Sequence, residues 1–162
     1  MATMLFTALR KYAEYAGRAR RKEYWQFVLL TVLVGIVAGV LDAVLGLKLG
    51  TGRTAQGPIA TIANLALLLP SLAVTVRRLH DTGRTGWWMV APLVLGLAFT
   101  FAFLIPSLTG GTARVLREAG LGIGLGLAFI IVSILLFVFM LQDSSPGANR
   151  FGPDPKAAER GV

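Results

Sequence analysis

The sequence predicts an all-α polytopic membrane protein: a bundle of four transmembrane helices with a short N-terminal amphipathic helix. Of its 162 residues, 55% are hydrophobic and only 15% are charged, whereas a soluble domain carries about 25% charged residues. Four stretches lack Asp, Glu, Lys and Arg, and they are 24–41, 54–76, 85–113 and 119–142. Because about 20 apolar residues cross a hydrocarbon core of roughly 30 Å, each stretch predicts a membrane span.

These stretches place the spans at about 24–46, 57–79, 87–107 and 120–142. Four spans leave little room for a soluble domain, so residues 1–162 are expected to form a single membrane domain with a tail at 143–162. The first apolar run is longer than the 7–15 residues of a signal-peptide core, and we expect it to remain in the mature protein.

The distribution of Lys and Arg predicts the orientation in the membrane. Twelve of these residues fall before the first span, between the second and third spans, or in the tail, and four fall in the other two loops. Positive charge is enriched on the cytoplasmic side of membrane proteins. We therefore expect a multi-pass protein of the bacterial inner (plasma) membrane, with both termini and the 77–86 loop in the cytoplasm.

The N-terminal residues 5–16 show helical spacing of apolar side chains at Leu5, Leu9, Tyr12 and Ala16. This pattern is typical of an amphipathic helix in the membrane interface, or of a packed terminal helix with no lipid role.

Glycine and proline residues within the spans predict where helices pack closely and where one of them bends. Gly35 and Gly39 form a GxxxG step, and Gly120, Gly122, Gly124 and Gly126 repeat this spacing, which allows two helices to approach closely. Pro70 is expected to kink the second span and to free a carbonyl that a neighbour or water must satisfy.

Asp42 is the charged residue inside a span, near the outer end of the first one. We interpret it as an interfacial carboxylate that reaches water. The alternative is an ion-binding role with Thr61 or Asn64 as its polar partner, since ionisable groups in membranes are often functional.

The segment 74–88 places several polar side chains between two apolar runs. A catalytic site would need Thr82 or Thr85 brought to His80, and the spacing does not demand that geometry. We expect no enzyme activity and no cofactor. Because the chain has no Cys and one His, we also expect no metal site.

The same loop is expected to meet the segment before the first span, which would bring Arg77, Arg78 and Arg84 close to Arg18, Arg20 and Arg21. We favour an internal ion-pair network in which Asp81 and Glu23 neutralise these arginines. Binding of lipid headgroups is the second interpretation, because clustered guanidinium groups recognise phosphate.

Three sequence segments carry a family resemblance: GRARRKEYWQF at 17–27, AVTVRRLHDTGRTGWW at 73–88 and GANRFGPDP at 147–155. They resemble the signature segments of the domain of unknown function 805 family, the YhaH-like small membrane proteins of bacteria. The resemblance extends from about residue 5 to 156 and implies a small helical protein of the cytoplasmic membrane. It implies no particular activity.

We therefore predict a protein that acts through a cytoplasmic-side surface. That surface would bind lipid headgroups, a protein partner or a second copy of the chain, but no nucleic acid, because the net charge of +8 lies beside membrane spans. The alternative is a transporter or channel component that works as an oligomer. The candidate binding residues are Arg18, Arg21, Glu23, Trp25, Arg77, Arg78, His80, Asp81, Arg84, Trp87 and Asn149.

Overall fold

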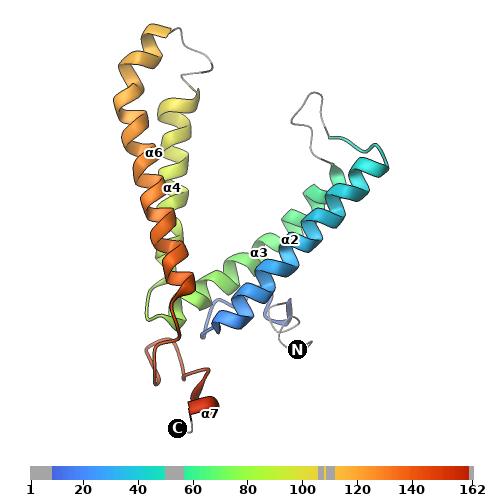
Figure 1. Ribbon diagram of the computed structural model, residues 1–162, viewed down its shortest axis with the longest axis vertical. Helices are drawn as coiled ribbons and strands as arrows, with labels where there is room; N and C mark the ends of the chain where they lie inside the picture. The colour runs from blue at the N-terminus through green and yellow to red at the C-terminus, as the bar shows by residue number, and fades with distance from the viewer. Residues whose placement is uncertain (1–8, 50–56, 106–107, 109–111, 161–162) are drawn as a thin grey trace.

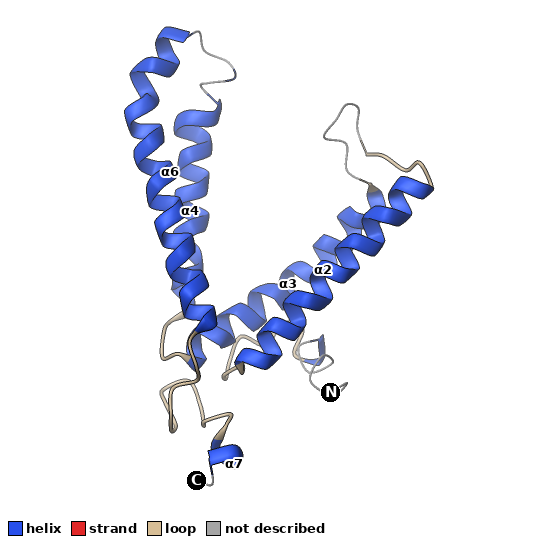
Figure 2. Cartoon of the chain, in the orientation of Figure 1, coloured by secondary structure: helices blue, strands red, loops and turns tan. Residues whose placement is uncertain are grey.

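The computed structural model describes residues 9–49, 57–105, 108 and 112–160. Helices and loops make up these residues (Figure 2), with one isolated β-bridge between Asn149 and Gly152. The helices are α2 (Arg21–Val44), α3 (Pro58–Asp81), α4 (Val90–Phe99), α6 (Thr112–Leu141) and α7 (Ala157–Arg160), with a 3-10 helix η1 (Gly86–Met89) and a π-helix η2 (Thr100–Leu104).

Four helical segments are long and apolar enough to cross a membrane: Arg21–Val44, Pro58–Asp81, Gly86–Phe103 and Ala119–Leu141. They agree with the predicted spans to within a few residues. Helix α6 begins at Thr112, so the residues just before the fourth span are helical and continuous with it. A helix can extend beyond the hydrocarbon core, and the apolar run therefore marks the membrane span better than it marks the helix end.

The helices form two hairpins that meet at one end (Figure 1). Helices α2 and α3 pack together, as do α4 and α6, and the two pairs diverge from each other away from this end. We call it the closed end. It holds the first residue of α2, the last residue of α3, η1 and the last residue of α6. The segment just before α2 and the tail after α6 also lie at this end, so the three segments of the family resemblance gather at one place.

The N-terminal segment is less helical than expected. Residues 5–8 of the predicted helix lie outside the described residues, Leu9 and Arg10 are helical, and a turn follows at 11–13. The helix therefore does not continue to Ala16. Leu9 packs against the small core of Ala19, Phe27 and Val74, which favours a packed segment over one held by lipid alone.

The carbonyl that Pro70 leaves without a helical partner is bonded by the N-terminal segment. Proline has no N–H, so the carbonyl of Ala66, four residues earlier, loses its helical partner. The hydroxyl of Tyr12 donates a hydrogen bond to this carbonyl. A neighbour or water was predicted at the freed carbonyl, and the structure shows that the neighbour is Tyr12.

Replacing Tyr12 by phenylalanine tests this compensation. Tyr12→Phe is expected to lower the free energy of unfolding by about 1 kcal/mol, because the Ala66 carbonyl loses its donor. Thermal unfolding in detergent measures the change. Tyr15→Phe is the control, since both tyrosines are 40% exposed and the structure gives the Tyr15 hydroxyl no described hydrogen bond. Equal losses of stability in the two variants would contradict a role for the Tyr12 hydroxyl as the donor to the Ala66 carbonyl.

Only some of the glycines in the predicted GxxxG steps lie against another described helix. A side chain at Gly122 would overlap the ring of Phe103, and one at Gly126 would contact Phe99, so these glycines let α6 approach the α4–η2 segment. Gly35 and Gly39 have open space at the Cβ position in the described part of the chain. The close helix approach expected there is not made among the described residues.

Asp42 corrects a sequence expectation. Its side chain is buried, with the residue only 4% exposed, rather than reaching interfacial water. One carboxylate oxygen accepts a hydrogen bond from the N–H of Ile59 at 3.0 Å and the other from the N–H of Ala60 at 2.8 Å. Asp42 thus satisfies the free N–H groups at the start of α3, and it does not use the side chains of Thr61 or Asn64.

Candidate functional site

The closed end is organised around the carboxylate of Asp81, which is fully buried. It accepts hydrogen bonds from Arg18 Nε at 3.0 Å, from Arg78 Nη1 at 2.6 Å and from Ser144 Oγ at 2.5 Å. These three donors come from the N-terminal segment, from α3 and from the tail after α6. A single carboxylate therefore joins segments that are more than sixty residues apart in the sequence.

Arg18 extends this network into the tail. Its Nη1 donates to the Gly147 carbonyl at 2.7 Å and its Nη2 to the Ser145 carbonyl at 2.6 Å. Gly17, with a φ of 86°, makes the left-handed turn just before it. The planar guanidinium can serve several acceptors at fixed angles, so Arg18 fixes both the turn and the first part of the tail.

The adjacent arginines of α3 have different partners. Arg78 donates to the Met140 carbonyl at 3.4 Å and to the Gln142 carbonyl, and thus binds the free carbonyls at the end of α6. Arg77 instead points to α2, where its Nη1 lies 2.9 Å from Glu23 Oε1. Arg77 Nε and Nη2 are buried and have no hydrogen-bond partner among the described residues.

The internal ion-pair network predicted from the sequence is therefore present. Arg18, Arg77, Arg78 and Asp81 are buried, and buried charges are stable only when they are paired. The donors of Arg18 and Arg78 are directed at protein oxygens, and the two donors of Arg77 without a described partner are buried, so these arginines are not available to a lipid phosphate. Four of the candidate binding residues thus hold the closed end together.

His80 and Asp81 do not form a catalytic pair. The Nδ1 of His80 lies 3.2 Å from the Gly17 carbonyl, and its ring stacks on Phe151 with centroids 3.9 Å apart. Asn149 donates from Nδ2 to the His80 carbonyl at 3.0 Å. The hydroxyl of Thr82, one of the two that a catalytic site would need at His80, instead donates a hydrogen bond to the Leu79 carbonyl at 3.0 Å.

Two other candidates, Arg84 and Trp25, pack against α6. The Arg84 guanidinium lies 3.8 Å from the centroid of the Phe139 ring and donates to Gln142 Oε1 at 2.7 Å. The Trp25 ring meets Phe137 edge to face at 6.0 Å. Trp87 differs from them, since it is 77% exposed. It lines an open hollow of about 570 Å³ with Tyr15, His80 and Phe151.

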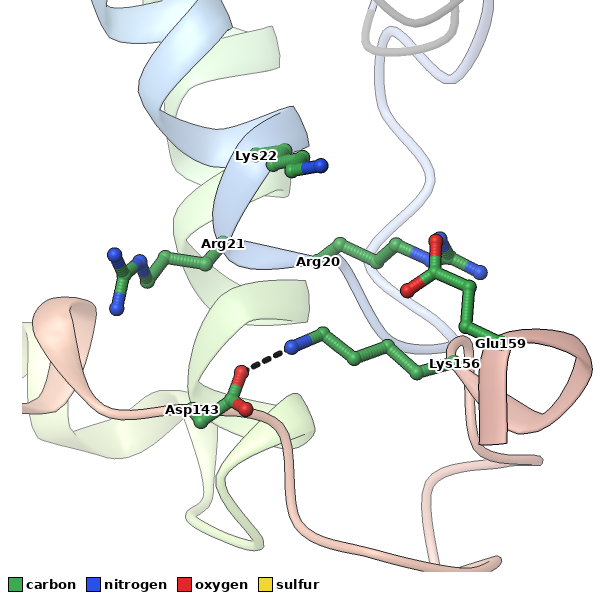
Figure 3. A pocket seen from close by; sticks show the side chains of 6 residues that line it. All are labelled: Arg20, Arg21, Lys22, Asp143, Lys156 and Glu159. Carbon is green, nitrogen blue, oxygen red and sulfur yellow. Dashed lines mark hydrogen bonds and ion pairs between the residues drawn. The ribbon is translucent and has the colours of Figure 1, made fainter. Parts of the chain in front are cut away.

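A second hollow, which we call the basic pocket, lies where α2 begins (Figure 3). It has a volume of about 370 Å³. Four cationic and two acidic side chains line it: Arg20, Arg21, Lys22, Lys156, Asp143 and Glu159. Arg20 Nη1 lies 2.6 Å from Glu159 Oε1, and Lys156 forms an ion pair with Asp143.

Of the residues that line this pocket, Arg20 and Arg21 were expected from the sequence among the arginines that meet at this end. Lys22 lies in the same basic run, which could have indicated it, but Lys156 and Glu159 reach the pocket only because the tail folds back to α2. The Arg21 Nη1 also donates to the Leu141 carbonyl at 3.3 Å. In the described ranges, no three His, Asp or Glu side chains gather in a way that could hold a metal ion.

Comparison with known proteins identifies the family. A family profile described as "Protein of unknown function (DUF805)" matches residues 12–153. The chain is 36% identical to inner membrane protein YhaH of Escherichia coli strain K12 over 148 aligned residues. The alignment covers 91% of this chain and 92% of the relative. Inner membrane protein YhaI of the same strain is 32% identical over 150 residues, covering 93% and 92%. No solved structure matches the chain significantly. With its four apolar spans, the chain is an inner membrane protein that belongs to the DUF805 family.

Proposed function

We propose that the protein binds the phosphate group of an anionic phospholipid in the basic pocket, on the cytoplasmic face of the membrane. The observation that supports this most is the position of the pocket. Four cationic side chains surround it at the first residues of α2, the level at which a membrane span meets the lipid headgroups. The asymmetry of Lys and Arg favours the cytoplasmic side for this end of the molecule.

The charges of the pocket favour an anion. Its four cations exceed its two carboxylates by two charges. Lys22 is exposed and has no described ion pair, whereas the buried arginines nearby are occupied by Asp81 and Glu23. A guanidinium such as that of Arg21 can donate two parallel hydrogen bonds to a phosphate. Each basic group near an anionic surface adds about 1 kcal/mol of attraction.

Neutralising Lys22 tests the proposal. Lys22→Gln is expected to weaken the binding of phosphatidylglycerol about fivefold, since about 1 kcal/mol of attraction is lost. The protein in detergent is titrated with phosphatidylglycerol, and native mass spectrometry measures the fraction that retains the lipid. Lys48→Gln is the matched control, because Lys48 is also an exposed lysine but lies near the outer end of α2.

The result is interpreted by comparing the variants. Equal lipid retention by Lys22→Gln, Arg21→Gln and the unsubstituted protein would overturn the proposal. A protein partner lost from the Lys22→Gln variant while its lipid remains would overturn it too, in favour of a protein-binding surface. The lipid affinity is also expected to fall as salt is added, because exposed charges are screened.

A further inference from the structure

We infer that the C-terminal tail competes with the lipid for the basic pocket. This inference rests on the proposed function, because it concerns the regulation of the same site. Glu159 of α7 places its carboxylate 2.6 Å from Arg20 Nη1, and Lys156 pairs with Asp143 (Figure 3). The pocket thus contains carboxylates of the protein itself where the phosphate of a lipid would bind.

The two parts of the tail are held differently. The first part is fixed to the buried network, because Arg18 binds the Gly147 carbonyl, Asn149 binds the His80 carbonyl and Phe151 stacks on His80. The last part, 156–160, is joined to the helices by the Glu159 and Lys156 ion pairs as far as the described contacts show. Only this last part can leave without breaking the network.

The ion pairs that hold the last part of the tail are exposed to water and therefore weak. The side chains of Glu159 and Asp143 are 59% and 61% exposed, so water screens their attraction to the cations. Glu159 receives one described hydrogen bond from Arg20, through Oε1, whereas a lipid phosphate can bind a guanidinium with two. The phosphate is therefore expected to displace Glu159 from Arg20 and to release α7.

Asp154 marks the boundary between the two parts of the tail. The side chain of Asp154 accepts hydrogen bonds from the N–H of Gly147 at 3.2 Å and of Lys156 at 2.8 Å. Release of α7 would therefore start after Asp154 and expose residues 156–160 on the cytoplasmic face.

A spin label on the tail tests the release directly. The chain contains no Cys, so Ala157→Cys provides a single attachment site in the full-length protein. In nanodiscs of phosphatidylcholine the label is expected to be immobilised, and phosphatidylglycerol in the discs is expected to make it mobile. A label at Ala148→Cys, in the fixed part of the tail, is expected to keep its mobility. A label at 157 that stays immobilised while phosphatidylglycerol binds would overturn the inference but not the proposed function.

Removing the competing carboxylate tests the same inference by affinity. Glu159→Gln is expected to bind phosphatidylglycerol about two- to fivefold more tightly than the unsubstituted protein, because a weak ion pair no longer opposes the lipid. Glu14→Gln removes the same charge from an exposed pair with Lys11 outside the pocket, and its affinity is expected to be unchanged. Equal affinities for Glu159→Gln and Glu14→Gln would overturn the competition. If the unsubstituted protein binds no phosphatidylglycerol, the proposed function itself fails.

Discussion

Replacing Asp81 by asparagine is expected to lower the free energy of unfolding by about 3–5 kcal/mol, the usual cost of removing one partner from a buried ion pair. Asparagine retains an acceptor oxygen of similar shape but carries no charge. The guanidinium groups of Arg18 and Arg78, both buried at the closed end, would then lack a counter-charge. Chemical unfolding in detergent, followed by tryptophan fluorescence, measures the loss.

Asp143→Asn is the matched control for this experiment. Asp143 is also an aspartate that pairs with a cation, but its side chain is 61% exposed. Exposed ion pairs contribute about 0–1 kcal/mol, so this variant should unfold nearly like the unsubstituted protein. If Asp81→Asn were as stable as Asp143→Asn, Asp81 would not be the residue that holds the three segments together.

The spans could be predicted from the sequence because their length is set by the bilayer rather than by contacts within the protein. An uncharged apolar run of sufficient length has few alternatives to a membrane-spanning helix. The structure places a helix over each such run. The N-terminal segment could not be predicted in the same way. Its helical spacing is real, but the contact of Tyr12 with Ala66 depends on a proline more than fifty residues later.

The ion-pair network was predicted by residue type, but not by partner. Arg77 and Arg78 lie four and three residues before Asp81 on the same helix, and side chains at both spacings can reach each other, so the spacing alone does not decide which arginine pairs with Asp81. Only the packing of α3 between α2 and the end of α6 determines that Arg77 meets Glu23 and Arg78 meets Asp81. The basic pocket was missed because Lys156 and Glu159 come to α2 through a turn that has no periodic pattern.

The second large effect is expected at Gly57, the residue just before α3. A methyl group added there would overlap Cβ and the carboxyl group of Asp42. Because Cβ is itself overlapped, the whole side chain would have to move, and a change at the flexible end alone would not relieve the clash. The N–H groups of Ile59 and Ala60 would then lose their acceptor at the end of the α2–α3 hairpin that lies away from the closed end.

Gly57→Ala is therefore expected to lower the free energy of unfolding by about 2 kcal/mol, from overpacking together with the lost capping hydrogen bonds. Gly35→Ala is the control, since a methyl group there meets open space, and chemical unfolding in detergent compares the two. Asp42→Gly combined with Gly57→Ala separates the two causes, because this substitution removes both Cβ and the carboxyl group of Asp42 and so removes the clash. The double variant should be no less stable than Asp42→Gly alone. A further loss in the double variant would mean that Gly57 is required for a reason other than the position of Asp42.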